Sequence, residues 1–246
     1  MVTNNYSYHQ GLKGYSQRQK EKRKKKKMKK SNQIFSVLIL FFLFLLGLDL
    51  SAQDIALPAP NKTGGKPLMQ ALNERQSTRS FTKDNLTPQQ LSDLLWAGWG
   101  FNRPDQKKRT APSSMNVQEI DVYVALPGGL YLYVGESNTL KQVNSKDIRK
   151  LCGTQEFVAD AALNLIYVAD MGKLKKKEGD PIKESDLLSS YANTGFIAQN
   201  VYLYCASENL GCVIRGSVPK DKLSPEMGLR SNQVIILSQT VGIIKK

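Results

Sequence analysis

The chain of 246 residues holds one histidine, His9, and that residue lies in a strongly basic N-terminal segment. Residues 53–246 therefore contain no histidine. This absence excludes a Ser-His-Asp triad, a Cys-His dyad, an HExxH zinc site and a histidine general base from that part of the chain. The sequence also lacks the GxGxxG and GxxxxGK[ST] patterns, so neither a Rossmann nor a P-loop nucleotide site is indicated.

Cysteine is almost as scarce, with Cys152, Cys205 and Cys212 only. They show no CxxC spacing, and without histidine a metal site would need carboxylates to complete it, so we expect no metal site. We interpret the three cysteines as small buried apolar side chains. An oxidising compartment would also permit a disulfide between Cys205 and Cys212.

Basic residues, in contrast, are in excess, with 35 Lys and Arg against 21 Asp and Glu and a formal net charge of +14. Eleven of the basic and only two of the acidic residues lie in residues 1–52, which leaves the rest of the chain at about +5. A charge concentrated in a leader gives the folded part no special affinity for polyanions. We therefore expect no nucleic-acid partner, with a basic nucleic-acid or membrane-surface binder as the remaining alternative.

Residues 1–52 have the organisation of a secretory signal. Residues 20–30 are almost all Lys or Arg, an apolar run extends from Ile34 to Leu48, and small residues follow at Ser51 and Ala52. A membrane-spanning helix needs about 20 apolar residues, more than this run provides. We predict an exported, periplasmic protein cleaved after Ala52. The alternative is an uncleaved inner-membrane anchor, which would be its sole membrane contact.

The remaining chain has the length of one domain, with residues 53–66 predicted as an exposed lead-in and residues 67–246 as the folded part. Helices are predicted over residues 67–75, 87–98 and 186–208, the last with Gly211 as its stop. The second helix is the best marked, because Thr87 can act as N-cap, Pro88 suits the first helical position and Gln90 completes a capping box.

Strands are predicted between these helices. Residues 120–124 and 130–134 alternate or cluster apolar side chains around a Pro-Gly-Gly turn, which indicates a hairpin. Further strands are predicted at 163–168, 212–214 and 234–238. Helices and antiparallel strands mixed without a βαβ rhythm predict the α+β class.

Two polar clusters are candidates for ligand binding. In residues 75–81, RQSTRSF, the guanidinium groups of Arg75 and Arg79 can converge on one phosphate, with Ser77 as a further donor. Residues 109–118 are dense in small donors and acceptors just before a predicted strand, which suits a planar heterocycle with polar edges. Taken singly, the first would also fit a solvated surface and the second a turn.

Taken in order, the clusters and later motifs resemble the FMN-dependent nitroreductase family. The motifs are RQSTRSF, PSSMNVQ, GLYLY, DIR, GFIAQNVYL, LGCVIRG and ILSQTVG, spread over about residues 68 to 243. The ordered set is what makes the resemblance specific. Within the family, LLWAG followed by FNR, APSS and GLYLY looks most like the branch of SagB-type and thiazole-oxidase dehydrogenases.

The resemblance implies a nitroreductase-like α+β fold, with a central, mainly antiparallel sheet flanked by helices, and a homodimer with FMN at the subunit interface. It implies that the flavin phosphate and pyrimidine edge are held by Arg75, Ser77 and Arg79, and that a loop from the other subunit reaches the same flavin with Pro112, Ser113, Ser114 and Asn116, which match a Pro-Ser-Ser-x-Asn pattern. It also implies an amide at the ring, which matches Gln155, and a backbone segment along the isoalloxazine, which matches Ile214, Arg215 and Gly216, with the Gly216 N–H donating near N5.

Two departures from the family pattern affect the expected site. The C-terminal arm of many members is reduced here to residues 243–246, where Lys245 would partly replace its basic residues at the phosphate. Azoline-oxidising relatives carry a Lys-Tyr pair before the long helix, and this chain has Ser190 and Tyr191 there. Tyr191 is thus expected to face the substrate without the lysine.

Together these implications predict an exported FMN-dependent oxidoreductase that passes a hydride through flavin N5 in a ping-pong reaction with a small-molecule substrate. The cofactor would carry the chemistry, which fits a folded part without histidine. A non-catalytic flavin-binding protein and an azoline- or thiazoline-type dehydrogenase are the alternatives. The electron donor stays open, because NAD(P)H is not expected outside the cytoplasm.

Overall fold

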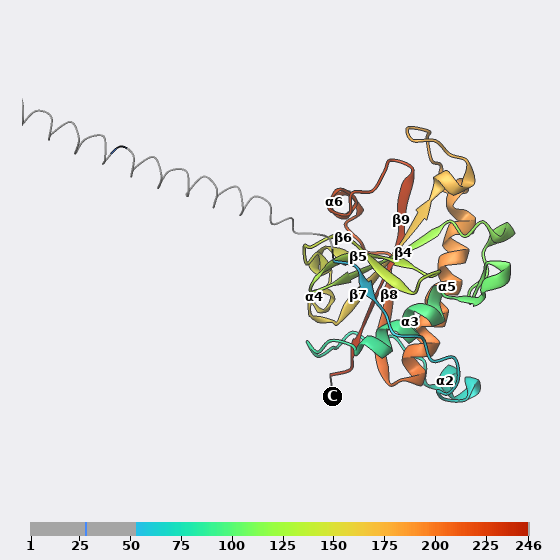
Figure 1. Ribbon diagram of the computed structural model, residues 1–246, viewed down its shortest axis with the longest axis vertical. Coiled ribbons are helices and arrows are strands. Elements are labelled where there is room, and N and C mark those ends of the chain that lie inside the picture. The colour runs from blue at the N-terminus through green and yellow to red at the C-terminus, as the bar shows by residue number, and fades with distance from the viewer. Residues whose placement is uncertain (1–27, 29–52, 246) are drawn as a thin grey trace, which may run out of the picture. The chain divides into compact units, whose positions relative to one another are not determined.

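The computed structural model describes Met28 and residues 53–245, so apart from Met28 the predicted signal peptide and its cleavage point lie outside the described residues. A seven-stranded sheet forms the centre of the fold (Figure 1), with every pair of neighbouring strands antiparallel. Its strands, in spatial order, are β1 (Ile55–Ala56), β6 (Thr139–Asn144), β5 (Gly129–Val134), β4 (Ile120–Leu126), β7 (Leu163–Asp170), β9 (Gln233–Ile243) and β8 (Leu210–Arg215). A separate hairpin pairs β2 (Phe101–Arg103) with β3 (Lys108–Arg109).

The α-helices of the described part are α2 (Leu68–Glu74), α3 (Pro88–Trp99), α4 (Phe157–Asp160), α5 (Leu188–Ser207) and α6 (Lys220–Glu226). Helix α3 begins as its sequence dictates. The Gln90 N–H donates to Thr87 Oγ1 at 3.1 Å and the Thr87 N–H donates to Gln90 Oε1 at 2.9 Å, which satisfies two donors that the first turn leaves free. Short 3₁₀ turns connect the elements at Pro104–Gln106, Ser114–Asn116, Arg149–Cys152, Met171–Leu174 and Glu184–Leu187.

The sheet is buried on both faces, which gives three layers. On one face α3 and α5 pack with Val122, Val124 and Tyr167 into the larger core. On the other face, residues 148–158 and α6 cover Tyr123 and Ile166 in a second core. Successive residues of a strand point to opposite faces, so β4 and β7 are apolar almost throughout because each face has its own core.

The α+β class and the mainly antiparallel sheet with flanking helices are confirmed. The predicted helices correspond to α2, α3 and α5, and the predicted strands to β4, β5, β7, β8 and β9. Gly211 as the stop of the long helix is wrong. The turn after α5 places Asn209 at φ 56°, and Gly211 is the second residue of β8. Within the lead-in of residues 53–66, Ile55 and Ala56 form β1 at the edge of the sheet.

All three cysteines are buried free thiols, as interpreted from the sequence, and no Cys205–Cys212 disulfide is formed. Within residues 53–245, no three His, Cys, Asp or Glu side chains gather in a way that would hold a metal ion. In the same part of the chain, every helix falls short of the length and apolarity that crossing a membrane requires.

Candidate functional site

The Arg75–Arg79 element follows directly on α2 and runs along β8. The Thr78 N–H donates to the Cys212 carbonyl at 2.9 Å, and a Cβ on Gly211 would come within 3.0 Å of the Thr78 side chain. The absence of that Cβ lets the two segments lie this close. The element is therefore fixed to the edge strand of the sheet, although Ser77 and Arg79 are themselves exposed.

Tyr202 of α5 contacts this element and holds it against β8. Its hydroxyl lies 2.9 Å from Ser77 Oγ and accepts the Ile214 N–H at 3.0 Å, and the Arg75 guanidinium lies 5.3 Å from the centre of its ring. A tyrosine that is 7% exposed needs a polar partner for its hydroxyl, and this one has two. One side chain thus joins Arg75, Ser77 and Ile214, three residues that the sequence assigned to one site.

Within residues 53–245, no carboxylate pairs with the cations of this element. Among the residues that the structure describes, Arg75, Arg79 and Lys245 form no ion pair. Neighbouring Glu74 is held by Lys66 instead, whose hydrogen bond is the main cause that lowers the pKa of that carboxyl. A cleft of about 400 Å³ opens beside Arg75 and is lined also by Thr78, Tyr202, Asn209 and Ile244.

The backbone of Lys245 lies beside the residues that follow Arg79. Its N–H donates to the Ser80 carbonyl at 3.2 Å, and the preceding residue, Ile244, forms a β-bridge with Phe81. The end of the described chain therefore follows residues 80–82 as an additional strand-like segment, and it brings a third cation to the same end of the fold.

Ile214, Arg215 and Gly216 lie at the end of β8, but the Arg215 side chain points inward. Its guanidinium donates to the Cys152 carbonyl, Asn164 Oδ1, Ser238 Oγ and Thr240 Oγ1, and the side chain is 7% exposed. Burial lowers the pKa of Arg215 to about 10. This leaves the backbone for ligand contact, and no acceptor for the exposed Gly216 N–H is found within residues 53–245.

Gln155 lies in the exposed turn between residues 149–152 and α4. The Arg215 bond to the Cys152 carbonyl fixes the start of this turn, and the Phe157 ring after it packs 5.8 Å from Phe81. The turn is therefore connected to the segment that follows Arg79.

The Pro-Ser-Ser-x-Asn loop lies elsewhere in the chain's fold. Ser114 donates its N–H to Asn193 Oδ1 on α5 at 3.2 Å, and Ser113 Oγ accepts the Gln118 N–H at 3.0 Å. Pro112, Ser114 and Asn116 are exposed. Asn193 and Tyr202 are nine positions apart on α5, about 14 Å along the helix axis at ~1.5 Å per residue. One chain therefore carries the predicted site as two separate halves.

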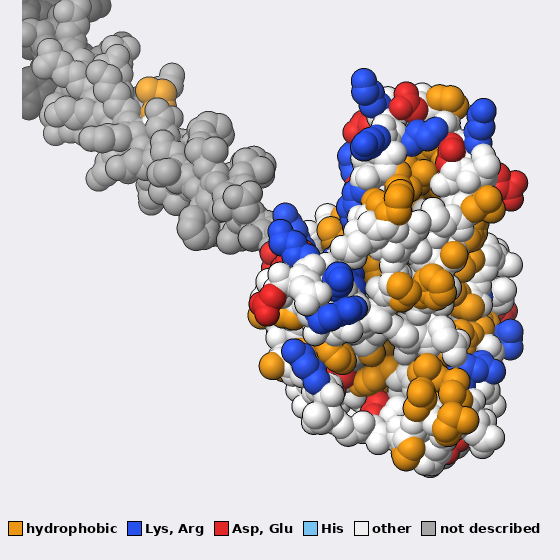
Figure 2. All heavy atoms as spheres, turned by 90° about the vertical axis from the view of Figure 1, so that its right-hand side faces the viewer, with side chains coloured by type: hydrophobic (Ala, Val, Ile, Leu, Met, Phe, Trp, Pro, Cys, Tyr) orange, Lys and Arg blue, Asp and Glu red, His pale blue; other side chains and the backbone are white. Residues whose placement is uncertain are grey.

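Tyr191 belongs to the half that holds the loop. It is 39% exposed near the start of α5 and lies on an outward face with Leu188 (66%) and Phe196 (46%). Figure 2 shows hydrophobic side chains spread over the face that carries α5 and α2. The exposed apolar residues of α2 are Leu68, Met69 and Leu72.

Sequence reasoning missed Tyr202, Asn193 and Glu119, which support the two halves from inside. Tyr202 and Asn193 occupy the buried face of α5, and Glu119 precedes β4 with 1% of its side chain exposed. The sequence does contain one signal for these contacts. The buried face of α5 is apolar except where Ser190, Asn193 and Thr194 interrupt it. A buried amide or hydroxyl needs a partner, so such an interruption marks a contact.

Comparison with known proteins identifies relatives of this chain. Residues 72–243 match the sequence pattern of the nitroreductase family. A crystal structure from Ralstonia eutropha JMP134, provisionally described as a nitroreductase, matches with a TM-score of 0.73 and 41% identity over 81% of this chain and 93% of that one. A protein of Methanocaldococcus jannaschii, also provisionally named a nitroreductase, is 23% identical over 180 residues, 69% of this chain and 88% of its own length.

More distant structures share the fold. The Escherichia coli microcin synthetase McbBCD complex with truncated pro-MccB17 has a TM-score of 0.58 at 16% identity, over 80% of each chain. The NADPH:FMN oxidoreductase from Vibrio harveyi complexed with NAD+ has a TM-score of 0.53 at 18% identity, over 73% of this chain and 69% of that one.

Proposed function

Since this chain belongs to the nitroreductase family of oxidoreductases, we propose that it is an FMN-dependent oxidoreductase that works as a homodimer in the periplasm. Arg75, Ser77 and Arg79 would hold the flavin phosphate, with Lys245 beside them. Pro112, Ser113, Ser114 and Asn116 would come from the second copy. Each part of this proposal depends on a different feature of the chain.

The unpaired cations at the Arg75–Arg79 element are the observation that carries the proposal. Surface arginines commonly pair with a carboxylate, and in the described part of this chain Arg75, Arg79 and Lys245 do not. Guanidinium groups form bidentate bonds with phosphate, and the exposed Ser77 hydroxyl adds a donor. The donors and charge present thus fit a phosphate group. The Tyr202 ring and hydroxyl hold Arg75 and Ser77 in place before any ligand binds.

The backbone after β8 suits the edge of a flavin ring. The Gly216 N–H is exposed and without an acceptor in the described residues, and a Cβ there would meet only Leu237 Cδ2 at 3.8 Å. A bound FMN would supply the redox chemistry, because a flavin takes up a hydride in one half-reaction and releases it in the next. The protein would bind, orient and donate hydrogen bonds. Tyr191 would face the substrate.

A second copy of the chain would unite the two halves. The two halves are anchored nine positions apart on α5, and the outward face of this helix exposes Leu188 and Tyr191 at its start and Phe196 between the anchors. Burying large apolar side chains of this kind favours association by about 25 cal/mol per Å² of apolar surface. In such a dimer, the loop of one copy would reach the Arg75–Arg79 element of the other.

The proposed export of the protein and its proposed place in the SagB-type branch are supported by the sequence alone. The basic and apolar leader favours the periplasm, where the electron donor or acceptor would differ from NAD(P)H, and LLWAG, FNR, APSS and GLYLY favour the SagB-type branch. The missing lysine before Tyr191 weighs against an azoline substrate.

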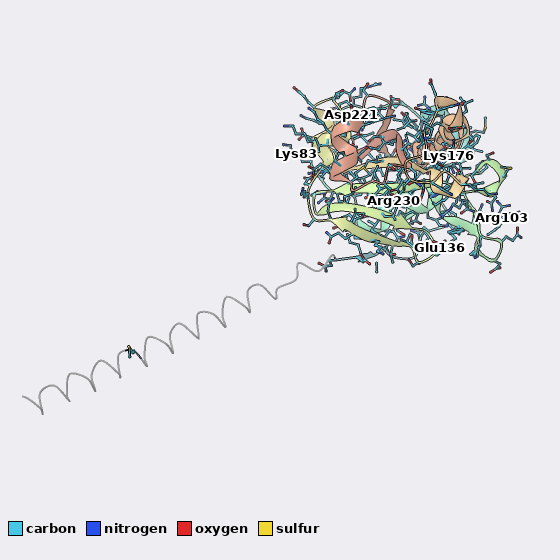
Figure 3. The ribbon with its side chains drawn as sticks, turned by 90° about the horizontal axis from the view of Figure 1, so that it is seen from above. Lys83, Arg103, Glu136, Lys176, Asp221 and Arg230 are labelled. Atoms are coloured by element: carbon cyan, nitrogen blue, oxygen red, sulfur yellow. The ribbon has the colours of Figure 1, made fainter. Side chains whose placement is uncertain are left out.

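Flavin retention by the protein expressed from Gln53 onward tests the proposal. Wild type mixed with FMN and passed over gel filtration is expected to elute yellow, and dithionite followed by candidate acceptors then separates an enzyme from a passive flavin carrier. R75A/R79A is expected to elute colourless. Lys141→Ala is the matched control, because Lys141 is an exposed cation on β6, toward the other end of the sheet from β8. Arg103 is unsuitable although it lies on the opposite side of the molecule from Lys83 (Figure 3), because its hairpin bonds to Gln118 of the loop half. Equal flavin in R75A/R79A and wild type would refute the phosphate assignment.

A further inference from the structure

The loop at residues 113–118 has an unusual backbone. Met115, Asn116 and Gln118 have φ values of 49°, 54° and 55°, in the left-handed region that side chains other than glycine seldom adopt. Asparagine tolerates this region, but each of the other two residues costs on the order of 1 kcal/mol. Met115 is 88% exposed, so its own packing does not repay that cost. Contacts from neighbouring elements must therefore hold the loop in this shape.

Asn193 of α5 supplies such a contact at the start of the loop. Its Oδ1 accepts the Ser114 N–H at 3.2 Å, just before the left-handed residues begin. The amide is 2% exposed, so water does not compete for it. An asparagine amide can be turned by half a rotation, however, and the turned amide would present an NH₂ group to the Ser114 N–H.

Glu119 determines which way this amide points. Asn193 Nδ2 donates to Glu119 Oε1 at 2.8 Å, and this bond is buried. Turning the amide would place two donors against each other at Ser114 and two oxygens against each other at Glu119. Glu119 therefore ensures that an oxygen faces the Ser114 N–H.

The same carboxyl group is poorly suited to a purely structural role. Its second oxygen, Glu119 Oε2, is buried without a partner among residues 53–245, and so are Ser190 Oγ and Thr194 Oγ1 on the same helix face. A buried polar atom without a partner costs about 1–3 kcal/mol. Such a cost, together with the loop's backbone strain, is typical of positions kept for function.

We propose that Glu119 is a positioning residue for the cofactor loop, acting through Asn193. By fixing the amide, it holds Ser114 and the left-handed turn so that Ser113, Ser114 and Asn116 face the FMN of the second copy. This inference rests on the proposed function for its cofactor, but the effect on the loop itself does not.

Four variants test the relay: E119A, N193A, their double variant and E119Q. We expect E119A and N193A each to weaken FMN binding about tenfold, the equivalent of ~1.4 kcal/mol. The double variant should be no weaker than either single one, because both act through one contact. E119Q keeps an acceptor for Asn193 and should restore affinity to within about threefold of wild type. Ser189→Ala, which removes a half-buried hydroxyl near the start of the same helix, should leave affinity unchanged.

Hydrogen exchange of the loop amides in FMN-free protein provides an independent readout. The Ser114 and Gln118 amides should exchange about tenfold faster in E119A and N193A than in wild type and E119Q. If E119A does not fold, the exchange rates of N193A and E119Q are compared instead, and the proposal predicts faster exchange in N193A only. Equal exchange, additive losses of affinity, or an E119Q variant as weak as E119A would overturn the proposal. If wild type binds no FMN, the proposed function fails while the exchange result still decides the role of Glu119.

Discussion

Replacing Tyr202 with phenylalanine is the sharpest test of how the Arg75–Arg79 element is held. The change removes one oxygen atom, which accepts the Ile214 N–H at 3.0 Å and lies 2.9 Å from Ser77 Oγ. The ring remains, so the core of α5 and the stacking of Arg75 are preserved. Any effect of Y202F therefore measures the hydroxyl alone.

The two partners of that hydroxyl contribute unequally. Ser77 is exposed, so water can replace its lost bond and the cost at this side is close to zero. Ile214 is half-buried in the otherwise buried strand β8, and leaving its N–H without an acceptor costs about 1–3 kcal/mol. We expect Y202F to lower the free energy of unfolding by about 2 kcal/mol, which for a domain of this size lowers Tm by roughly 4–8 °C.

Urea and thermal unfolding of Y202F beside Ser77→Ala provide the measurement and its control. S77A removes the other end of the same hydrogen bond but leaves the hydroxyl on Ile214, so its loss should stay below about 0.5 kcal/mol. Both variants should bind FMN more weakly than wild type, because Ser77 is no longer held or no longer present. If Y202F and S77A are equally stable, the hydroxyl does not support the strand and this reasoning is refuted.

Three further predictions concern the scaffold. Burial raises the pKa of the Cys152 thiol to about 12, so its contribution to the free energy of unfolding is fully present below about pH 9 and is lost as pH rises toward 12. Urea unfolding between about pH 9 and 11 should therefore show that the free energy of unfolding falls less steeply with pH in C152A than in wild type, by about 1.4 kcal/mol per pH unit. G153A puts a Cβ against the Arg215 guanidinium, which four acceptors hold in place, and should cost about 1–3 kcal/mol in urea unfolding, whereas an unchanged midpoint would show that Arg215 moves freely. Thr87→Ala breaks the capping box of α3 and should cost about 1 kcal/mol in the same assay, with Thr87→Ser close to wild type.

The sequence predicted the elements whose pattern is local. The capping residues at Thr87 and Gln90, the Pro-Gly-Gly turn and the apolar runs of β4, β5 and β7 each depend on neighbours within a few positions. It did not predict β1, the β2–β3 hairpin, β6, α4 or α6. Strand β6 reads TLKQVN, with polar side chains at an outer position of the sheet, and β1 is two residues long, so both exist because β5 and β6 present an edge to pair with. Such pairing is tertiary and leaves no periodic signal.

In the candidate site, too, the residues with a local sequence motif could be predicted, and their tertiary arrangement could not. The residue types at Arg75, Ser77 and Asn116 were readable because motifs carry them, while their separation into two halves is a consequence of where α5 places Asn193 and Tyr202. Arg215 shows the limit of a motif, because its side chain serves a buried network and leaves the backbone to the ligand. Whether a side chain points into the core or out of it depends on the register of β8 against β9.

Cofactor content at defined oligomeric state tests the central claim most directly. Purified protein beginning at Gln53 is mixed with FMN, separated by gel filtration with light scattering, and its visible absorption is recorded across the protein peak. We predict one peak with the mass of a dimer and flavin absorption that follows the protein in equimolar ratio. A monomer that elutes without flavin absorption would contradict the account.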